Sequence, residues 1–139
     1  MSITVQRVFL VSACLLGLRT RYDGASKAND WVLSLTSKHL LIPVCPEQLG
    51  GLSTPRPAAQ IWGGDGGAVL NGTAKVILET GEDVTEEFLR GAAEVLRLAR
   101  LYRIEGAFLK ARSPSCGLSK LGVCAALLQA HGYQIYEID

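Results

Sequence analysis

At 139 residues, with 48% hydrophobic and 19% charged side chains, the chain has the size and composition of one globular domain. A domain of this size can fold without a metal or disulfide to stabilise it, so a metal site here would serve function. The formal net charge of +1 provides no electrostatic basis for binding long nucleic acid or an anionic membrane. We therefore expect a small-molecule partner, while the oligomeric state is not indicated.

The segment 11–14 (Val-Ser-Ala-Cys) is similar to the cleavage box of a bacterial lipoprotein signal. Only three apolar residues, 8–10, separate Arg7 from that box, whereas a signal needs roughly 7 to 15. The apolar run 8–18 is also shorter than the roughly 20 residues that span a bilayer. We therefore expect a cytoplasmic protein without a membrane segment. Its four cysteines would then be free thiols, available for metal binding or catalysis.

The first half of the chain predicts two strands, the first of them buried, and each is followed by a cysteine. Val5 to Val11 is an apolar run rich in β-branched residues, and it leads to Cys14. Asn29-Asp30 then offers an N-cap for a helix that ends near residues 38–39. Leu40 to Val44 is the next apolar run, and Pro46 begins a turn directly after Cys45.

The middle of the chain is dense in Gly and Pro. Residues 49–67 predict a long ordered loop, whose length suggests a functional role beside the site. Asn71-Gly72 stands between the apolar segments 68–70 and 73–78 and is a typical two-residue hairpin turn. We therefore expect a small peripheral β-hairpin from these two segments.

The last third predicts two helices and two strands. Asp83 is expected to cap a long amphipathic helix. Its apolar stripe consists of Phe88, Ala92, Val95, Leu96, Ala99 and Tyr102. A strand at 106–110 leads through a turn to Cys116, and a helix from about 120 to 131 stops at Gly132. Residues 133–138 alternate polar and apolar side chains like an edge strand.

This alternation predicts an α/β fold: a single Rossmann-like domain over residues 1–139, with a mostly parallel sheet, helices on both faces and a small β-hairpin insertion. Ligands of such sheets bind outside the carboxyl ends of the strands. Cys14, Cys45 and Cys116 all follow strands, so we expect the three thiols to converge at one edge. Cys124 lies within an apolar helix and is expected in the core. No C-x2-C pair is present, so spacing alone does not identify a metal.

Seven short stretches, in one order along nearly the whole chain, resemble the thiouracil desulfidase family. They are Val11–Gly17, Arg21–Gly24, Val44–Glu47, Gly50–Pro57, Gly63–Gly66, Asp83–Phe88 and Leu109–Gly117. The resemblance implies a 4Fe-4S cluster held by Cys14, Cys45 and Cys116, with the fourth iron open, free of protein ligands. Some members carry a further cysteine where this chain has Thr20. That position is not one of the three ligands, so the cluster should form without it.

The activity implied by the resemblance is removal of sulfur from thiouracil or a related thiolated nucleobase or nucleotide. It releases sulfide and the oxo product without net redox. Thiophilic iron would bind the thione sulfur as a Lewis acid, so that water adds at the C=S carbon and the cluster accepts the sulfide. No nicotinamide or flavin is expected, and no G-x-G-x-x-G follows the first strand.

Two residues are candidates for proton transfer. Glu47 stands two positions after Cys45 and could act as the base, although an exposed turn carboxylate is the alternative. Ser113 precedes Cys116, and its hydroxyl could relay a proton, donate to cluster sulfur or orient water, although it could also cap the helix that follows.

Five further residues are expected to contact the substrate, namely Ser12, Tyr22, Asp23, Arg56 and Ser115. Tyr22 could stack on a pyrimidine and Asp23 could accept a ring N–H, or both could belong to a solvated turn. Arg56 could hold a carbonyl oxygen or a phosphate, or be an ordinary surface arginine.

Two other functions compete with the desulfidase. One is a zinc- or persulfide-bearing sulfur carrier, which would be colourless with zinc, whereas an iron-sulfur protein is brown. The other is a nucleotide-binding module whose cysteines fill the core. In that case Cys45→Ala would lower stability by about 1 kcal/mol without changing the metal content.

Overall fold

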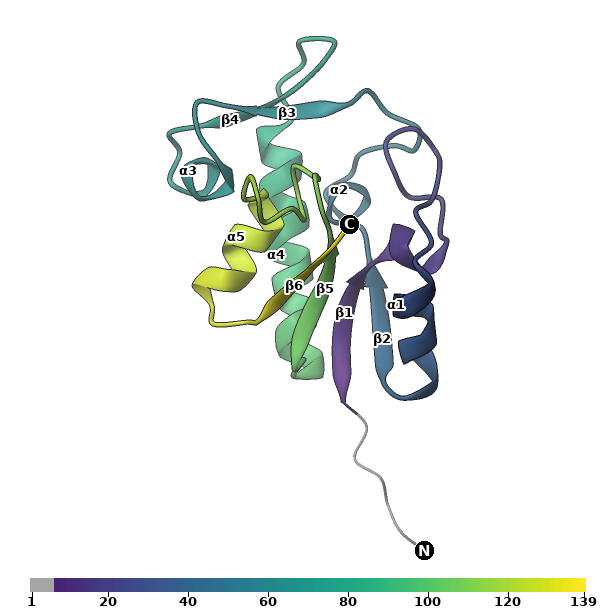
Figure 1. The fold of residues 1–139 in the computed structure, drawn as a ribbon. Helices are drawn as coiled ribbons and strands as arrows, with labels where there is room; N and C mark the ends of the chain where they lie inside the picture. The colour runs from purple at the N-terminus through teal and green to yellow at the C-terminus, as the bar shows by residue number, and fades with distance from the viewer. Residues whose placement is uncertain (1–6) are drawn as a thin grey trace, which may run out of the picture.

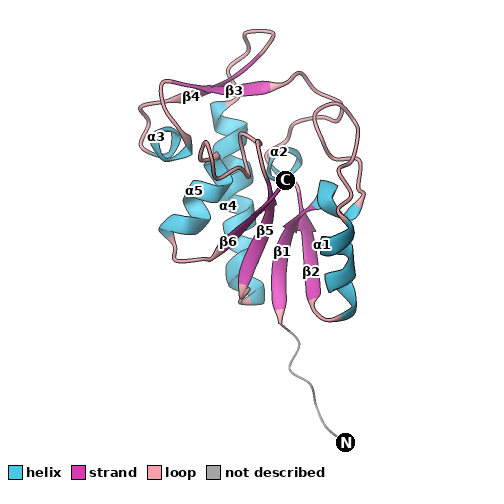
Figure 2. Cartoon of the chain, in the orientation of Figure 1, coloured by secondary structure: helices cyan, strands magenta, loops and turns pink. Residues whose placement is uncertain are grey.

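The computed structural model describes residues 7–139 and has an α/β fold built on a four-stranded parallel sheet (Figure 1). The strand order is β2-β1-β5-β6, and all three neighbouring pairs are parallel. These strands are β1 (Val8–Ser12), β2 (Leu40–Val44), β5 (Gly106–Lys110) and β6 (Ile135–Ile138). A separate antiparallel hairpin pairs β3 (Ala59–Trp62) with β4 (Lys75–Leu78) and lies beyond the carboxyl ends of the sheet (Figure 2).

Helices cover both faces of the sheet, as expected. They are α1 (Asp30–Ser34), α2 (Pro46–Leu49), α3 (Gly66–Leu70), α4 (Thr85–Tyr102) and α5 (Val123–Ala130), with 3-10 turns η1 (Ala13–Leu16) and η2 (Leu35–Ser37). In Figure 1, α1 lies on one side of the sheet and α4 and α5 lie on the other. None of the helices in the described part of the chain is both long and apolar enough to cross a membrane.

Alternating side chains of β1 separate two cores. Phe9 and Val11 pack with Val32 of α1 and Phe108 of β5 on one face. Leu10 points to the opposite face, into the larger core formed mainly with α4 and α5. Period-two alternation places successive side chains on opposite faces, so a five-residue strand contributes to both cores.

Most of the expected strands are confirmed. β2 and β5 have the predicted bounds, and β6 lies at the sheet edge. β1 begins at Val8, while the predicted start at Val5 falls outside the described residues.

The hairpin exists, but the prediction of its strands was wrong. Residues 68–70 belong to α3, because the Asp65 side chain accepts a hydrogen bond from the Ala68 N–H and so caps a helix there. Asn71 ends this helix, and Gly72 follows it with φ 83°. The true partner of β4 is β3, which lies inside the stretch 49–67 that was expected to be a loop.

The long helix α4 differs from its prediction in its N-cap and in one residue of its apolar stripe. The N-cap of α4 is Val84 and not Asp83. The carboxylate of Asp83 instead accepts hydrogen bonds from the backbone N–H and the hydroxyl of Thr85. The predicted apolar stripe is buried except for Tyr102, which is 51% exposed in the last turn.

Two glycine contacts bring the segments around the site into close packing. Gly50, at the end of α2, and Gly91, in α4, allow these helices to approach backbone to backbone. A Cβ on Gly91 would overlap the Pro46 carbonyl oxygen, and one on Gly50 would overlap the Glu87 carbonyl oxygen. Any larger residue would therefore push α2 away from α4.

Candidate metal centre

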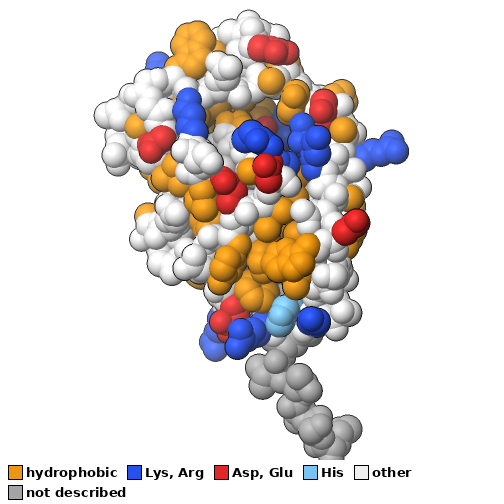
Figure 3. Space-filling view, in the orientation of Figure 1, with side chains coloured by type: hydrophobic (Ala, Val, Ile, Leu, Met, Phe, Trp, Pro, Cys, Tyr) orange, Lys and Arg blue, Asp and Glu red, His pale blue; other side chains and the backbone are white. Residues whose placement is uncertain are grey.

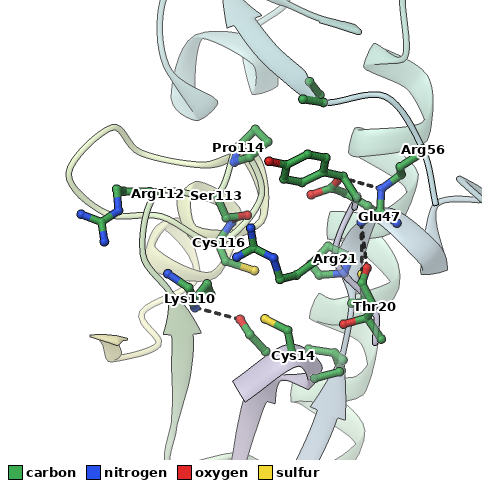
Figure 4. A pocket seen from close by; sticks show the side chains of 18 of the residues that line it. Cys14, Thr20, Arg21, Glu47, Arg56, Lys110, Arg112, Ser113, Pro114 and Cys116 are labelled. Atoms are coloured by element: carbon green, nitrogen blue, oxygen red, sulfur yellow. Dashed lines mark hydrogen bonds and ion pairs between the residues drawn. The ribbon is translucent and has the colours of Figure 1, made fainter. Parts of the chain in front are cut away.

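A cavity of about 260 Å³ opens at the carboxyl ends of β1, β2 and β5. This is near the lower limit of small-molecule sites, roughly 300 to 1,000 Å³. Its wall includes Cys14, Cys45 and Cys116, from three separate segments of the chain. In Figure 4 the sulfur atoms of Cys14 and Cys116 point into the same space.

Each of these cysteines is held by the element that carries it. Cys14 is buried in the 3-10 turn directly after β1, and Cys45 is the residue before α2. After β5 the chain turns at Arg112, which has a φ of 59°, and returns Cys116 to the cavity wall. Cys124 is buried in α5 among the core residues and does not line the cavity, as expected.

Burial makes two of these thiols weak acids. It raises the pKa of the Cys116 thiol to about 12, although a hydrogen bond from Ser12 partly offsets this effect. Burial also raises the pKa of Cys14, against the lowering effect of the nearby Arg21 charge. In the metal-free protein both side chains are therefore neutral thiols at pH 7, and a bound metal would have to displace their protons.

Glu47 is buried on the cavity wall and bonded through both carboxylate oxygens. Arg56 Nε donates to Oε1 at 3.0 Å, and Ser115 Oγ donates to Oε2 at 3.2 Å. The alternative of an exposed turn carboxylate does not describe this side chain, which is only 9% exposed as a residue. Each carboxylate oxygen keeps a second lone pair for a proton or a water.

Ser113 also lines the cavity and organises the turn that carries Cys116. Its hydroxyl accepts hydrogen bonds from the backbone N–H of Ser115 and of Cys116, both at 3.1 Å. It does not cap α5, whose N-cap is Gly122. Both acceptor positions of the hydroxyl are occupied, so its O–H remains as a donor.

The five residues expected at the substrate are not all brought to the cavity. Ser12, Tyr22 and Arg56 line it, whereas Asp23 and Ser115 do not. Ser115 is 1% exposed and lies behind Glu47. The Asp23 carboxylate pairs with Arg21 and accepts from the Ala25 N–H at 2.9 Å, as expected of a solvated turn.

Comparisons with known proteins agree with one another. A model of the 2-thiouracil desulfurase family matches residues 9–139. The chain belongs to the 2-thiouracil desulfurase family. It is 42% identical over 141 aligned positions to the uncharacterized protein YbbK of Bacillus subtilis. This alignment covers 92% of the present chain and 93% of YbbK.

A solved structure of a related protein adds an activity to this comparison. The protein is the 4Fe-4S-dependent thiouracil desulfidase TudS, whose sequence is 38% identical to this chain and whose structure matches it with a TM-score of 0.82. The alignment covers 95% of this chain and 91% of TudS. This member of the 2-thiouracil desulfurase family is therefore a homologue of a 4Fe-4S-dependent enzyme along almost its full length.

Three cations that were given no role from the sequence line the cavity of this desulfurase family member, namely Arg21, Lys110 and Arg112. Figure 3 shows Lys and Arg side chains gathered on this face above the carboxyl ends of the strands. Burial lowers the pKa of Lys110, and Arg112 pairs with Asp139. Lys110 was detectable in the sequence, because it ends a predicted strand at the edge where the cysteines were expected.

Proposed function

We propose that this protein is a 4Fe-4S-dependent, non-redox desulfidase, which converts thiouracil or a related thiolated nucleobase or nucleotide to its oxo form and releases sulfide. One observation carries the proposal: three cysteines from the ends of separate strands share a cavity wall with Glu47 and Ser113. The likeness to TudS over 95% of the chain supports it. We place the protein in the cytoplasm, where its four free cysteines would stay reduced.

The donor set suits an iron-sulfur cubane held by Cys14, Cys45 and Cys116. Thiolates are the usual ligands of such clusters, and three of them would leave one iron without a protein ligand. A single ion needs its ligands within one small coordination sphere, whereas a cubane takes each thiolate on a different iron. Across residues 7–139, no three side chains of His, Cys, Asp or Glu are placed to hold a single metal ion. The likeness to TudS, a 4Fe-4S-dependent enzyme, favours the cluster over the zinc-bearing carrier.

When bound, the cluster would supply a Lewis-acidic iron for the thione sulfur and would take up the sulfide. The chain itself must then bind the ring and move two protons. Tyr22, 42% exposed at the cavity wall, offers a ring face for stacking on a pyrimidine. Ser12 lies deeper, where its hydroxyl accepts from the Lys110 N–H at 2.9 Å and is directed to Cys116.

The hydrogen bonds on the cavity wall suggest which group accepts a proton and which donates one. Glu47 is an acceptor with lone pairs to spare, so we assign it the proton of the attacking water. Ser113 has only its O–H left, so we assign it the relay of a proton to the ring nitrogen: it donates its own proton and regains the one that Glu47 took from the water. Ser115 orients the Glu47 carboxylate and does not meet the substrate.

Anaerobic reconstitution tests the proposal. The wild-type protein should bind four irons and four sulfides per chain and convert 2-thiouracil to uracil and sulfide. Cys14→Ser, Cys45→Ser and Cys116→Ser should lose the cluster and the activity, whereas the matched control Cys124→Ala should keep both. A fully loaded protein without turnover of thiouracil or its nucleotide would contradict the proposed activity, and a colourless zinc protein would contradict the cofactor.

A further inference from the structure

Arg56 is a buried arginine on the cavity wall, and every N–H of its guanidinium is used within the protein. The residue is 8% exposed. It makes five side-chain hydrogen bonds, to Glu47 Oε1, the Ser53 carbonyl, Thr54 Oγ1, the Thr20 carbonyl and Cys45 Sγ. A guanidinium has five N–H donors, so none remains for a substrate carbonyl or phosphate.

Three of these acceptors belong to two segments that are far apart in sequence. Glu47 lies in α2, Cys45 immediately precedes α2, and Thr20 lies in the loop that leads to Tyr22. The Thr20 carbonyl is shared, because it also accepts from Cys45 Sγ at 3.6 Å. The backbone N–H of Arg56 donates to the Tyr22 carbonyl at 2.8 Å. One side chain and its own peptide group therefore connect a cysteine, a carboxylate and the loop carrying the aromatic ring.

We infer that Arg56 is a positioning residue, which fixes the Cys45 sulfur and the Glu47 carboxylate relative to each other and to the Thr20–Tyr22 loop. The inference rests on the proposed function for the cluster that Cys45 would hold. Arg56 Nη2 lies 3.9 Å from Cys45 Sγ and would also act directly on a cluster held by Cys45. Hydrogen bonds to the sulfur of a ligand raise the reduction potential of the cluster.

Arg56→Lys tests this role, because lysine keeps the positive charge but cannot bond to several acceptors in the fixed geometry of a guanidinium. The matched control is Arg90→Lys. Arg90 lies in α4 and donates one hydrogen bond to the end of α2, from Nη1 to the Gly50 carbonyl at 3.0 Å. It does not line the cavity.

We expect Arg56→Lys to lose iron to a chelator roughly 10 to 100 times faster than wild type. Its cluster should have a lower reduction potential and an altered visible circular dichroism spectrum, which a change in stability alone would not produce. In metal-free protein, amide hydrogen exchange should quicken in 18–24 and 53–57. Arg90→Lys should resemble wild type in all of these measurements.

Iron retention and reduction potential equal to those of Arg90→Lys would overturn the inference, whatever the exchange rates. If Arg56→Lys does not fold, the double variant Arg56→Met and Glu47→Gln replaces it. This variant removes both charges, so that no buried ion is left without a partner. It should likewise lose iron faster than wild type and have a lower reduction potential. If the wild-type protein assembles no cluster, the proposed function fails, and hydrogen exchange in the metal-free variants alone decides the role of Arg56.

Discussion

Glu47 combines two properties that a buried general base needs: a fixed orientation and unused acceptor capacity. Arg56 and Ser115 each donate to one of its oxygens, so the carboxylate cannot rotate freely. The remaining lone pairs are available to a water in the cavity that it lines. The proton-transfer role that we propose for Glu47 is therefore separable from any role in holding iron.

Replacing Glu47 by glutamine should therefore lower kcat by roughly 100- to 10,000-fold while leaving the iron content unchanged, because a positioned base contributes about that much. The measurement is turnover of reconstituted protein at equal cluster occupancy. Glu86→Gln, an exposed change at the start of α4, is the control and should be silent. Unchanged turnover in Glu47→Gln would remove this residue from the chemistry.

The buried thiols predict how the stability of the metal-free protein depends on pH. The pKa of Cys116 rises from 9.0 to about 12 on folding, so the unfolded chain loses this proton first as the pH increases. The stabilisation is complete below pH 9 and is lost as the pH rises towards 12, at about 1.4 kcal/mol per pH unit for this thiol. Urea unfolding of reduced, metal-free protein at pH 7.5 and 10.5 should show the decline, and Cys116→Ala should show a smaller one. An equal fall in the free energy of unfolding between these two pH values in wild type and in Cys116→Ala would mean that Cys116 ionises in the folded protein as easily as in the unfolded chain.

At the scale of elements, α2 is a single helical turn whose position depends on its packing against α4. Four residues are too few to form a stable helix alone, so tertiary contacts must hold it. The backbone approach at Gly50 and Gly91 provides that contact and thereby sets where Cys45 and Glu47 lie.

Gly91→Ala should shift α2, lower the free energy of unfolding by roughly 1 to 3 kcal/mol and reduce iron binding on reconstitution. Ala93→Gly, on the exposed face of the same helix, is a control that costs about 1 kcal/mol through helix propensity but leaves α2 in place. Stability and iron content should therefore fall together only in Gly91→Ala. A normal iron content in Gly91→Ala would show that α2 tolerates the displacement.

The elements also show why part of the fold was predictable and part was not. The strands 40–44 and 106–110 were recognisable because short, continuous apolar runs bounded by turn residues are typical of strands, although β2 is an edge strand in which Leu40 and Pro43 are exposed. The β3–β4 pairing was misassigned because Asn71-Gly72 follows a helix as readily as it forms a hairpin turn. Local sequence does not distinguish these outcomes, since the choice depends on the cap made by Asp65.

Part of the site could also be predicted from the sequence, and part could not. Strand ends indicate which residues reach the rim of the sheet, and so the three cysteines could be placed from sequence. The contacts of Arg56 with Thr20, Cys45 and Glu47 could not, because they join segments whose spacing carries no periodic signal.

At the scale of the whole molecule, a parallel sheet brings together thiols that are far apart in sequence. β1, β2 and β5 are adjacent, so the residues that follow them meet at one edge without any short-range motif. The hairpin and the loops at 20–22 and 110–116 complete the cavity from outside the sheet.

The most direct test of this account is an anaerobic crystal structure of the reconstituted protein, with anomalous density measured at the iron absorption edge. We predict one cubane in the cavity, bonded to the sulfurs of Cys14, Cys45 and Cys116, with its fourth iron facing the space bounded by Glu47, Ser113 and Tyr22. A protein side chain bonded to the fourth iron, or a metal bound elsewhere by other residues, would contradict it.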